Sequence, residues 1–221
     1  ASLTKLMTVY TALQTLSLED EVTISADAMR PEGNGLSQGE VWTAEELADY
    51  TLLSSVNDGA RALLLASVEK KGGTYETFID EMNANATRMG LAQTYFANET
   101  GLDISETVGA SYGSAQDVAM LFEYLYRNNP RLLEATTKSQ KTFDPLSGSA
   151  HLGKNTSSLI ATLPGAVGSK TGFTDIAGGN LGIVFEALPG RPVVAVVLGS
   201  TREGRDGVMK MLGGGVKKWL I

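Results

Sequence analysis

Gly168-Ser169-Lys170-Thr171-Gly172-Phe173-Thr174 is the stretch that decides the fold of this 221-residue chain. Two further short runs rich in β-branched residues follow it at 181–187 and 192–199, and the turn-forming residues 188–191 stand between those two runs. Such runs, separated by a Pro-Gly turn, are typical of antiparallel strands joined by a hairpin. The last third of the chain therefore predicts an antiparallel sheet whose first strand is 168–174.

Upstream of this sheet the sequence has the periodicity of helices. Apolar residues recur at helical spacing over 3–16, and Ser2 stands where that helix would be capped. A short strand is predicted over 22–25 and a loop over 31–35. Further helices are predicted over 43–53, 59–69, 75–89, 114–128 and 205–220.

The order of these elements predicts an α+β fold, with an antiparallel sheet flanked by helices and an all-helical lobe beside it. We expect a single domain over 1–221. Its helical lobe would span about 17–140 and its sheet lobe about 141–221, with the helix 2–16 between them.

Composition excludes several classes of function. The net charge of −7 argues against a nucleic-acid partner, because neutralising phosphates requires a basic face. The absence of cysteine excludes a disulfide, a thiolate nucleophile and a cysteine-ligated zinc site. His151 is the only histidine, and we expect it to be a polar loop residue. A serine nucleophile in this chain would therefore need another base.

Ser2 and Lys5 form the first candidate pair. Residues three apart share a helix face, so the Lys5 amine can lie against the Ser2 hydroxyl. The helix dipole, burial and a second cation would each favour the neutral amine. A neutral lysine can then take the serine proton. The alternative is a capping serine followed by a solvated lysine, and the motif alone favours that alternative.

Ser55 and Asn57 fall between two predicted helices, so their side chains can project into a cleft. Ser55 could relay a proton between Lys5 and a leaving group, and the Asn57 amide could hold a substrate carbonyl. The alternative is that Ser55, Asn57 or Asp58 caps the helix that begins at Gly59.

Lys170, Thr171 and Gly172 lie on the predicted strand. Because Gly172 lacks a side chain, an extended peptide could lie close to the strand there. Lys170 and Thr171 offer a cation and a hydroxyl to a terminal carboxylate. The backbone N–H groups of Phe173 and Ser2 could form an oxyanion hole. A glycine-flanked turn with a surface lysine is the alternative, and this motif alone favours neither.

The motifs Ser-x-x-Lys, Ser-x-Asn and Lys-Thr-Gly occur in this order in penicillin-binding proteins. The wider chain resembles the low-molecular-mass penicillin-binding proteins that are D-alanyl-D-alanine carboxypeptidases, peptidase family S11. The resemblance runs almost from end to end, up to residue 202. Four segments carry it: ASLTKLMT (1–8), LSSVNDGA (53–60), FANETGLD (96–103) and GSKTGFT (168–174).

This resemblance implies the fold of serine β-lactamases and penicillin-binding proteins, with a transpeptidase-like catalytic domain. It implies that a serine attacks the penultimate D-alanine of a peptidoglycan stem peptide, and that water hydrolyses the resulting acyl-enzyme. β-Lactam antibiotics would acylate the same serine. No cofactor, metal ion or nucleic acid is expected. The implied catalytic residues are Ser2, Lys5 and Ser55, and the implied substrate-binding residues are Asn57, Lys170, Thr171, Gly172 and Phe173.

The chain departs from the family pattern in three places. Val56 stands where relatives often have glycine. We expect valine to be tolerated there, because only the side chains on either side of it, Ser55 and Asn57, take part in the site. Some relatives place an arginine ahead of the Lys-Thr-Gly strand to bind the carboxylate, whereas here only Lys154 is near. Relatives also have upstream strands in the central sheet that this chain lacks, so we expect an exposed sheet edge.

The first residues of the chain are informative about the cellular location of the protein. The chain opens at Ala1 without an initiator methionine, and it contains no signal peptide and no apolar run as long as a membrane span. We expect a piece of a longer exported precursor that works in the periplasm or at the outer face of the cytoplasmic membrane. Membrane association would come only through segments that this chain lacks.

Other functions remain open alongside the carboxypeptidase. A β-lactam or peptidoglycan-binding sensor, an inactive fragment, and a transpeptidase or endopeptidase would all show the same motifs. A class A β-lactamase would need a Glu-x-x-Leu-Asn segment for its deacylating water, and none stands between Ser55 and Lys170.

Overall fold

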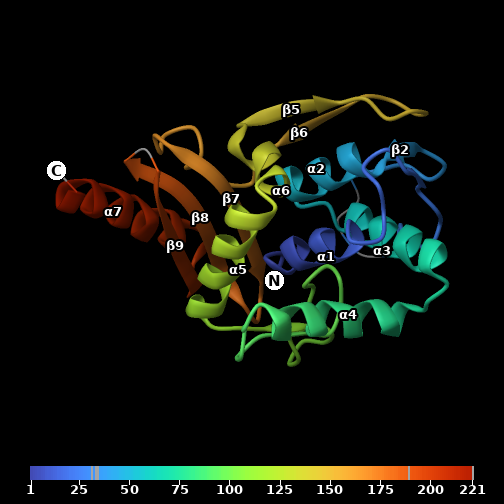
Figure 1. The fold of residues 1–221 in the computed structure, drawn as a ribbon, viewed down its shortest axis with the longest axis horizontal. Coiled ribbons are helices and arrows are strands. Elements are labelled where there is room, and N and C mark those ends of the chain that lie inside the picture. Colours follow the sequence, from blue (N-terminus) through green and yellow to red (C-terminus); the bar gives the residue numbers. More distant parts are fainter. Residues whose placement is uncertain (31, 33–34, 189, 221) are drawn as a thin grey trace.

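The computed structural model describes residues 1–30, 32, 35–188 and 190–220. Each helix predicted from periodicity is present, with its ends shifted by a few residues (Figure 1). Thr43 and Ser114 accept hydrogen bonds from the first turns of their helices, which explains where two of these helices begin. The helical elements are α1 (Thr4–Ala12), α2 (Ala44–Ser54), α3 (Asn57–Lys71), α4 (Tyr75–Arg88), α5 (Ala115–Asn128), α6 (Arg131–Glu134), the 3₁₀ turn η1 (Ala135–Thr137) and α7 (Arg202–Leu220).

The central sheet consists of three antiparallel strands in the order β7-β8-β9, as the sequence predicts. Lys170 of β7 lies opposite Gly182 of β8, and Ile183 lies opposite Ala195 of β9. The predicted turn 188–191 and the predicted loop 31–35 both include residues outside the described ranges. The strands are β1 (Glu21–Thr23), β2 (Val41–Thr43), β3 (Tyr95–Phe96), β4 (Ser111–Tyr112), β5 (Gln140–Phe143), β6 (His151–Lys154), β7 (Ala166–Thr174), β8 (Gly178–Leu188) and β9 (Arg191–Ser200).

Helices cover both faces of the central sheet. Side chains along β8 alternate between the two faces, so each face presents apolar side chains to a helix. Ile183 packs in a cluster with Met209 of α7. Val184 belongs to the larger core, together with Phe122 of α5. A Cβ on Gly182 would lie 2.1 Å from the Phe122 ring, so this glycine lets α5 approach the sheet closely. The result is the α+β layering expected from the sequence.

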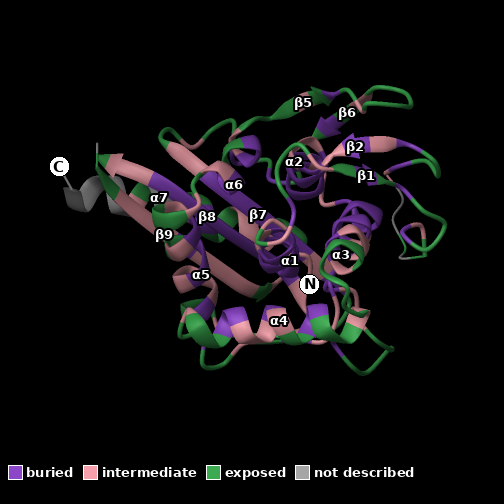
Figure 2. Ribbon diagram, turned by 45° about the vertical axis from the view of Figure 1, so that its right-hand side comes forward, coloured by how far each residue is buried: buried purple, intermediate pink, exposed green. Residues whose placement is uncertain are grey.

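Helix α1 runs through the middle of the molecule, packed against α2, α3 and α4 (Figure 2). Every residue of α1 except Tyr10 is at most slightly exposed. The amphipathic pattern of this segment predicts one exposed face, whereas the structure buries the helix on nearly all sides. The N-terminus of α1 reaches the outer edge of the sheet beside β7 (Figure 1), which brings Ser2 to the junction of sheet and helices.

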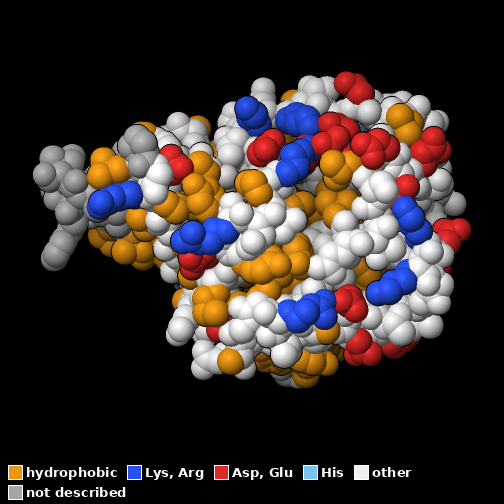
Figure 3. Space-filling view, viewed as in Figure 1, with side chains coloured by type: hydrophobic (Ala, Val, Ile, Leu, Met, Phe, Trp, Pro, Cys, Tyr) orange, Lys and Arg blue, Asp and Glu red, His pale blue; other side chains and the backbone are white. Residues whose placement is uncertain are grey.

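Ion pairs fasten α6 and β5 to α2. The Arg131 guanidinium lies 2.9 Å from the Asp49 carboxylate, and the Lys141 amine lies 2.8 Å from Glu46 and 3.1 Å from Asp49. Acidic and basic side chains are accordingly mixed along this side of the molecule (Figure 3). The β5–β6 hairpin thus packs on α2, while α5 packs on β8 and β9. The division into lobes near residue 140 stays a prediction.

His151 is a strand residue, so the prediction of a polar loop position is wrong. It lies in β6, opposite Phe143, and its Nε2 is 2.9 Å from a Glu40 carboxylate oxygen. Its ring packs against those of Trp42 and Tyr50, which stack on each other. Pairing with β5 and contact with these rings override the polar local sequence.

Among the described residues, no helix combines the length and the hydropathy needed to cross a membrane. The described part of the central sheet ends at β9 on one side and at β7 on the other.

Candidate active site

Ser2 lies in the turn that leads into α1. The Thr4 amide donates to the Ala1 carbonyl at 3.0 Å, and the Lys5 amide donates to the Ser2 carbonyl at 3.3 Å. Leu3 occupies the N-cap position and makes no side-chain cap. The alternative of a capping serine is therefore wrong. The Ser2 hydroxyl instead lies 2.8 Å from the Lys5 amine, because this turn places the two side chains on one face.

The Lys5 side chain is fully buried, and its amine also donates to the Thr100 carbonyl at 2.8 Å. Burial lowers the pKa of Lys5 to about 7, since the charged form loses its hydration; the Glu99 and Asp58 carboxylates oppose this shift. A solvated lysine, the alternative favoured by the motif alone, is thus excluded. A neutral amine beside a hydroxyl can act as a general base.

Ser55 and Lys170 form a second hydroxyl–amine pair, 2.7 Å apart. Ser55 joins α2 to α3 with φ of 61°, and no other non-glycine residue in the described part of the chain has a positive φ. Such backbone strain is found mostly where a side chain must be aimed at a functional site. Lys170 is 1% exposed, and burial, with the nearby Lys5 and Arg205 cations, holds its pKa well below the usual range. The structure thus pairs Ser55 with Lys170, and the expected relay of a proton from Lys5 through Ser55 stays a prediction.

Asn57 is the first residue of α3, and Val56 is its N-cap without a side-chain hydrogen bond. The predicted start of this helix at Gly59 is therefore two residues late. The Asn57 amide nitrogen donates to the Glu32 carbonyl, whereas its Oδ1 is buried and has no partner in the described residues. Asn57 Oδ1 can therefore accept from a substrate N–H. Because the contact with Glu32 uses only one of the two Nδ2 hydrogens, the expected contact with a substrate carbonyl stays a prediction. Asp58 accepts from the Gly59 amide at 2.9 Å.

Gly172 is required by the serine turn, whereas its expected role in the approach of an extended peptide stays a prediction. A Cβ at this position would lie 2.9 Å from the Ala1 Cβ and 3.0 Å from the Ser2 nitrogen. The absent side chain therefore lets β7 and the serine turn touch. This contact places the Lys-Thr-Gly strand and Ser2 in one site, and it excludes the alternative of an exposed turn.

The other two residues of the strand motif lie beside this contact. Thr171 is buried, and its hydroxyl donates to that of Thr156 at 2.7 Å. Phe173 is half-buried, and the Arg202 guanidinium lies 3.9 Å from its ring centroid. Lys154 is exposed on β6.

Two groups escaped the sequence reasoning. The carbonyl of Thr100 holds Lys5, and its segment was noticed only through the family resemblance. Arg205 of α7 donates to the carbonyls of Gly172 at 3.2 Å and Asn180 at 3.3 Å. Some relatives place an arginine ahead of the strand, whereas Arg205 comes after it, on a helix that folds back onto the sheet. Only the three-dimensional packing of α7 on the sheet reveals it.

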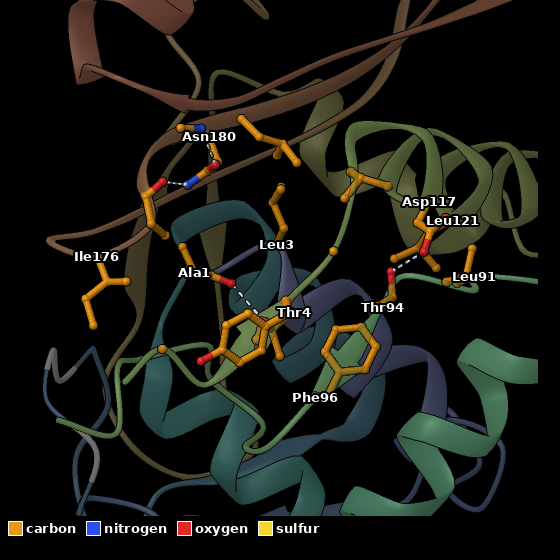
Figure 4. A pocket seen from close by; sticks show the side chains of 18 of the residues that line it. Ala1, Leu3, Thr4, Leu91, Thr94, Phe96, Asp117, Leu121, Ile176 and Asn180 are labelled. Atoms are coloured by element: carbon orange, nitrogen blue, oxygen red, sulfur yellow. Dashed lines mark hydrogen bonds between the residues drawn. The ribbon is translucent and has the colours of Figure 1, made fainter. Parts of the chain in front are cut away.

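An apolar pocket of about 290 Å³ lies beside the serine turn (Figure 4). Ala1, Leu3 and Phe96 contribute to its wall, and Thr94 donates to Asp117 at 2.8 Å along one side. Ser2 and Lys5 do not line it. The chemistry-bearing groups therefore lie outside this pocket.

Comparison with known proteins agrees with this geometry. Residues 1–202 match the family model described as D-alanyl-D-alanine carboxypeptidase. The chain is 32% identical over 208 residues to D-alanyl-D-alanine carboxypeptidase DacB2 of Mycobacterium tuberculosis, a match that covers 92% of the chain and 68% of that protein. It is also 32% identical to DacA of Escherichia coli K12, with 96% of the chain and 53% of DacA covered.

Solved structures of the same class of protein also superpose on this chain. The carboxypeptidase DacD of Francisella tularensis superposes with a TM-score of 0.81 and 27% identity, over 96% of this chain and 62% of that one. Penicillin-binding protein D2 of Listeria monocytogenes, solved in the ampicillin-bound form, superposes with a TM-score of 0.78 and 30% identity, over 97% and 86%.

The chain belongs to the D-alanyl-D-alanine carboxypeptidase family, peptidase family S11, and has the penicillin-binding-protein fold. It spans about half the length of the relatives from Bacillus subtilis and Escherichia coli, 54% and 53% respectively.

Proposed function

We propose that this chain is an active-site-serine D-alanyl-D-alanine carboxypeptidase that removes the terminal D-alanine from peptidoglycan stem peptides. The observation that carries the proposal is the 2.8 Å contact between the Ser2 hydroxyl and the amine of buried Lys5. A pKa of about 7 leaves about half of this amine neutral at neutral pH, so it can accept the serine proton.

In the first step the Ser2 oxygen attacks the carbonyl carbon of the penultimate D-alanine, and its proton passes to Lys5. Negative charge then develops on the carbonyl oxygen. The backbone N–H groups of Ser2 and Phe173 are the proposed donors to this oxygen, in keeping with the contact between the serine turn and β7.

In the second step the amide bond breaks and the nitrogen of the terminal D-alanine takes up a proton. Ser55 is the proposed donor, and its hydroxyl is held by the Lys170 amine. The proton that Lys5 took from Ser2 then restores the Ser55 hydroxyl, so Lys5 is neutral again before water attacks. The products of this step are free D-alanine and an ester on Ser2. Water then attacks the ester, with Lys5 again the base, and Ser2 is regenerated.

The substrate would lie along β7. This strand is an edge of the sheet, so it can offer unpaired backbone groups to an extended peptide. Asn57 Oδ1, which has no partner among the described residues, would accept a substrate N–H. Thr171, the Lys170 amine and the Arg205 guanidinium would meet the terminal carboxylate.

β-Lactams imitate the D-alanyl-D-alanine bond, so we expect them to acylate Ser2 as well. The Listeria relative was solved with ampicillin and with cefotaxime bound, which supports this expectation. Because peptidoglycan lies outside the cytoplasmic membrane, we infer that the protein acts there and is exported from a longer precursor.

Release of D-alanine from diacetyl-L-lysyl-D-alanyl-D-alanine tests the proposed reaction. The chain should release one D-alanine per peptide, and Ser2→Ala should release none. Acylation by a penicillin without any release would reject the carboxypeptidase and favour a sensor.

A transpeptidase is the second candidate, because a relative from Streptomyces K15 with a TM-score of 0.79 is a DD-transpeptidase. The same acyl-enzyme would then react with an amine in place of water. Adding glycine or a diamino acid to the assay would distinguish the two, since a transpeptidase would form a new peptide at the expense of hydrolysis.

A further inference from the structure

The Lys5 amine has a second fixed partner besides Ser2, the Thr100 carbonyl. Thr100 belongs to the segment 97–103 that follows β3, so the backbone of this segment decides where the amine lies. Gly101 has a φ of 79°, and a Cβ there would lie 2.1 Å from the Ala1 carbonyl oxygen. The segment therefore packs directly on the serine turn.

Glu99, the neighbour of Thr100, is a buried carboxylate with two partners. Its Oε1 accepts from the Arg61 guanidinium at 3.2 Å, and its Oε2 accepts from the Tyr75 hydroxyl at 2.9 Å. Its backbone carbonyl accepts from the Thr8 hydroxyl at 2.7 Å. Glu99 thus ties the segment to α1, α3 and α4 at once.

This anchor is charged, although burying an ion pair costs free energy that an apolar contact would avoid. The Arg61 guanidinium also lies 4.6 Å from the centroid of the Tyr75 ring, so all three side chains hold one another. Anchoring a loop does not by itself require a carboxylate at this position. The charge of Glu99 therefore suggests that this residue has a second role.

The second role concerns the ionisation of Lys5. Besides Glu99, the charged groups that act on the site are Asp58 from α3, Lys170 from β7, Arg205 from α7, Asp103 and the Ala1 amine. The Glu99 and Asp58 anions favour the ammonium form of Lys5, against the effect of burial. Tyr75, from α4, reaches Glu99.

We propose that Glu99 is a positioning residue for this site. Held by Arg61 and Tyr75, it fixes the Thr100 carbonyl against the Lys5 amine, and its charge sets the pH range in which Lys5 accepts a proton. The inference rests on the proposed function, in which Lys5 is the base.

The test is the rate of Ser2 acylation by a fluorescent penicillin, measured from about pH 5 to about pH 9 in the wild-type chain and in Glu99→Gln. Without the anion, the rising limb of the profile should move to lower pH by roughly half a unit to one unit. The plateau should fall roughly tenfold, because the amine is less well placed.

Two variants separate charge from anchoring. Tyr75→Phe removes one anchor and keeps the charge, so its plateau should fall while its limb stays in place. Glu81→Gln removes the same charge from the partly exposed partner of Arg88 on α4, and it should change neither quantity.

Glu99→Gln leaves the half-buried Arg61 without its carboxylate partner and could unfold the chain, so Glu99→Gln/Arg61→Gln is prepared as well. Within this pair it is the charge of Glu99 that acts on Lys5. The rising limb of the pH profile of the double variant should therefore also move to lower pH. If the variants fold, the wild type acylates normally and the rising limb of the pH profile does not move, the inference about Glu99 is overturned while the proposed function stands. A wild-type chain that never acylates overturns the proposed function instead.

Discussion

Lys5 joins two properties that seldom occur together, complete burial and a hydroxyl partner. An amine without its hydration shell loses its proton easily, and here the proton of Ser2 lies within hydrogen-bond distance. The spacing of Ser2 and Lys5 allows the pair, but only the family resemblance favoured it over a capping serine and a solvated lysine. The sequence could not predict the depth of burial, because that depends on α2, α3 and α4 closing around α1.

The first prediction concerns the pH dependence of acylation. The rate of penicillin acylation should rise with pH and reach half its maximum near pH 7, because only neutral Lys5 accepts the serine proton. His151→Ala should leave this profile in place, since His151 bonds to Glu40 and not to Ser2. Rates followed by labelled penicillin would check both points, and loss of acylation in His151→Ala would point to a different base.

Ser55 allows a prediction about strain. Ser55→Ala and Ser55→Gly both remove the hydroxyl, so both should lower D-alanine release strongly. Glycine adopts a φ of 61° without cost, and Ser55→Gly should therefore be the more stable variant by about 1 kcal/mol. Urea denaturation measures the difference, and equal stabilities would show that the backbone at this position is not strained.

At the scale of elements, the contact between β7 and the serine turn assembles the site. A strand motif and a helix motif far apart in the sequence meet because Gly172 has no side chain. The sequence predicted both elements and their roles. Which atoms fill the space above Gly172 depends on how the helix approaches the sheet, and no periodicity encodes that.

Gly172→Ala tests this contact. The new methyl group would push against the Ser2 nitrogen, so acylation should fall at least about tenfold, with a loss of roughly 1–3 kcal/mol in the free energy of unfolding. Gly207→Ala is the matched control, because a Cβ there meets nothing within 4 Å. It should leave acylation unchanged and stabilise α7 by about 0.5–1 kcal/mol. Full activity in Gly172→Ala would contradict the proposed role of the contact.

For the whole molecule, the long elements were predictable and most of the short ones were not; the exception is the strand predicted over 22–25, which is present as β1. The predicted helices and the sheet β7-β8-β9 follow from patterns of seven or more residues. The strands β2 to β6 have two to four residues each and are held by contacts such as those of His151 with Trp42, which local sequence cannot indicate. Arg205 reaches the site only because α7 folds back onto the sheet.

Whole-molecule stability should depend on pH through Lys5. Its pKa is about 7 in the folded chain and about 10.4 in an unfolded one, so between these values the unfolded state binds more protons. The free energy of unfolding should therefore rise from about pH 7 towards pH 10. Lys5→Met should show a shallower rise and be more stable than the wild type at pH 7, on the order of a few kcal/mol. Denaturant titrations at several pH values measure this, and a wild-type stability independent of pH would mean that Lys5 is not buried in its neutral form.

Intact-mass measurement with peptide mapping, after brief exposure to a penicillin, tests the central claim most directly. The account predicts a single covalent adduct on Ser2, formed faster as the pH rises through 7, and no adduct in Ser2→Ala or Lys5→Met. An adduct on any other residue, or a Lys5→Met chain that acylates at the wild-type rate, would contradict it.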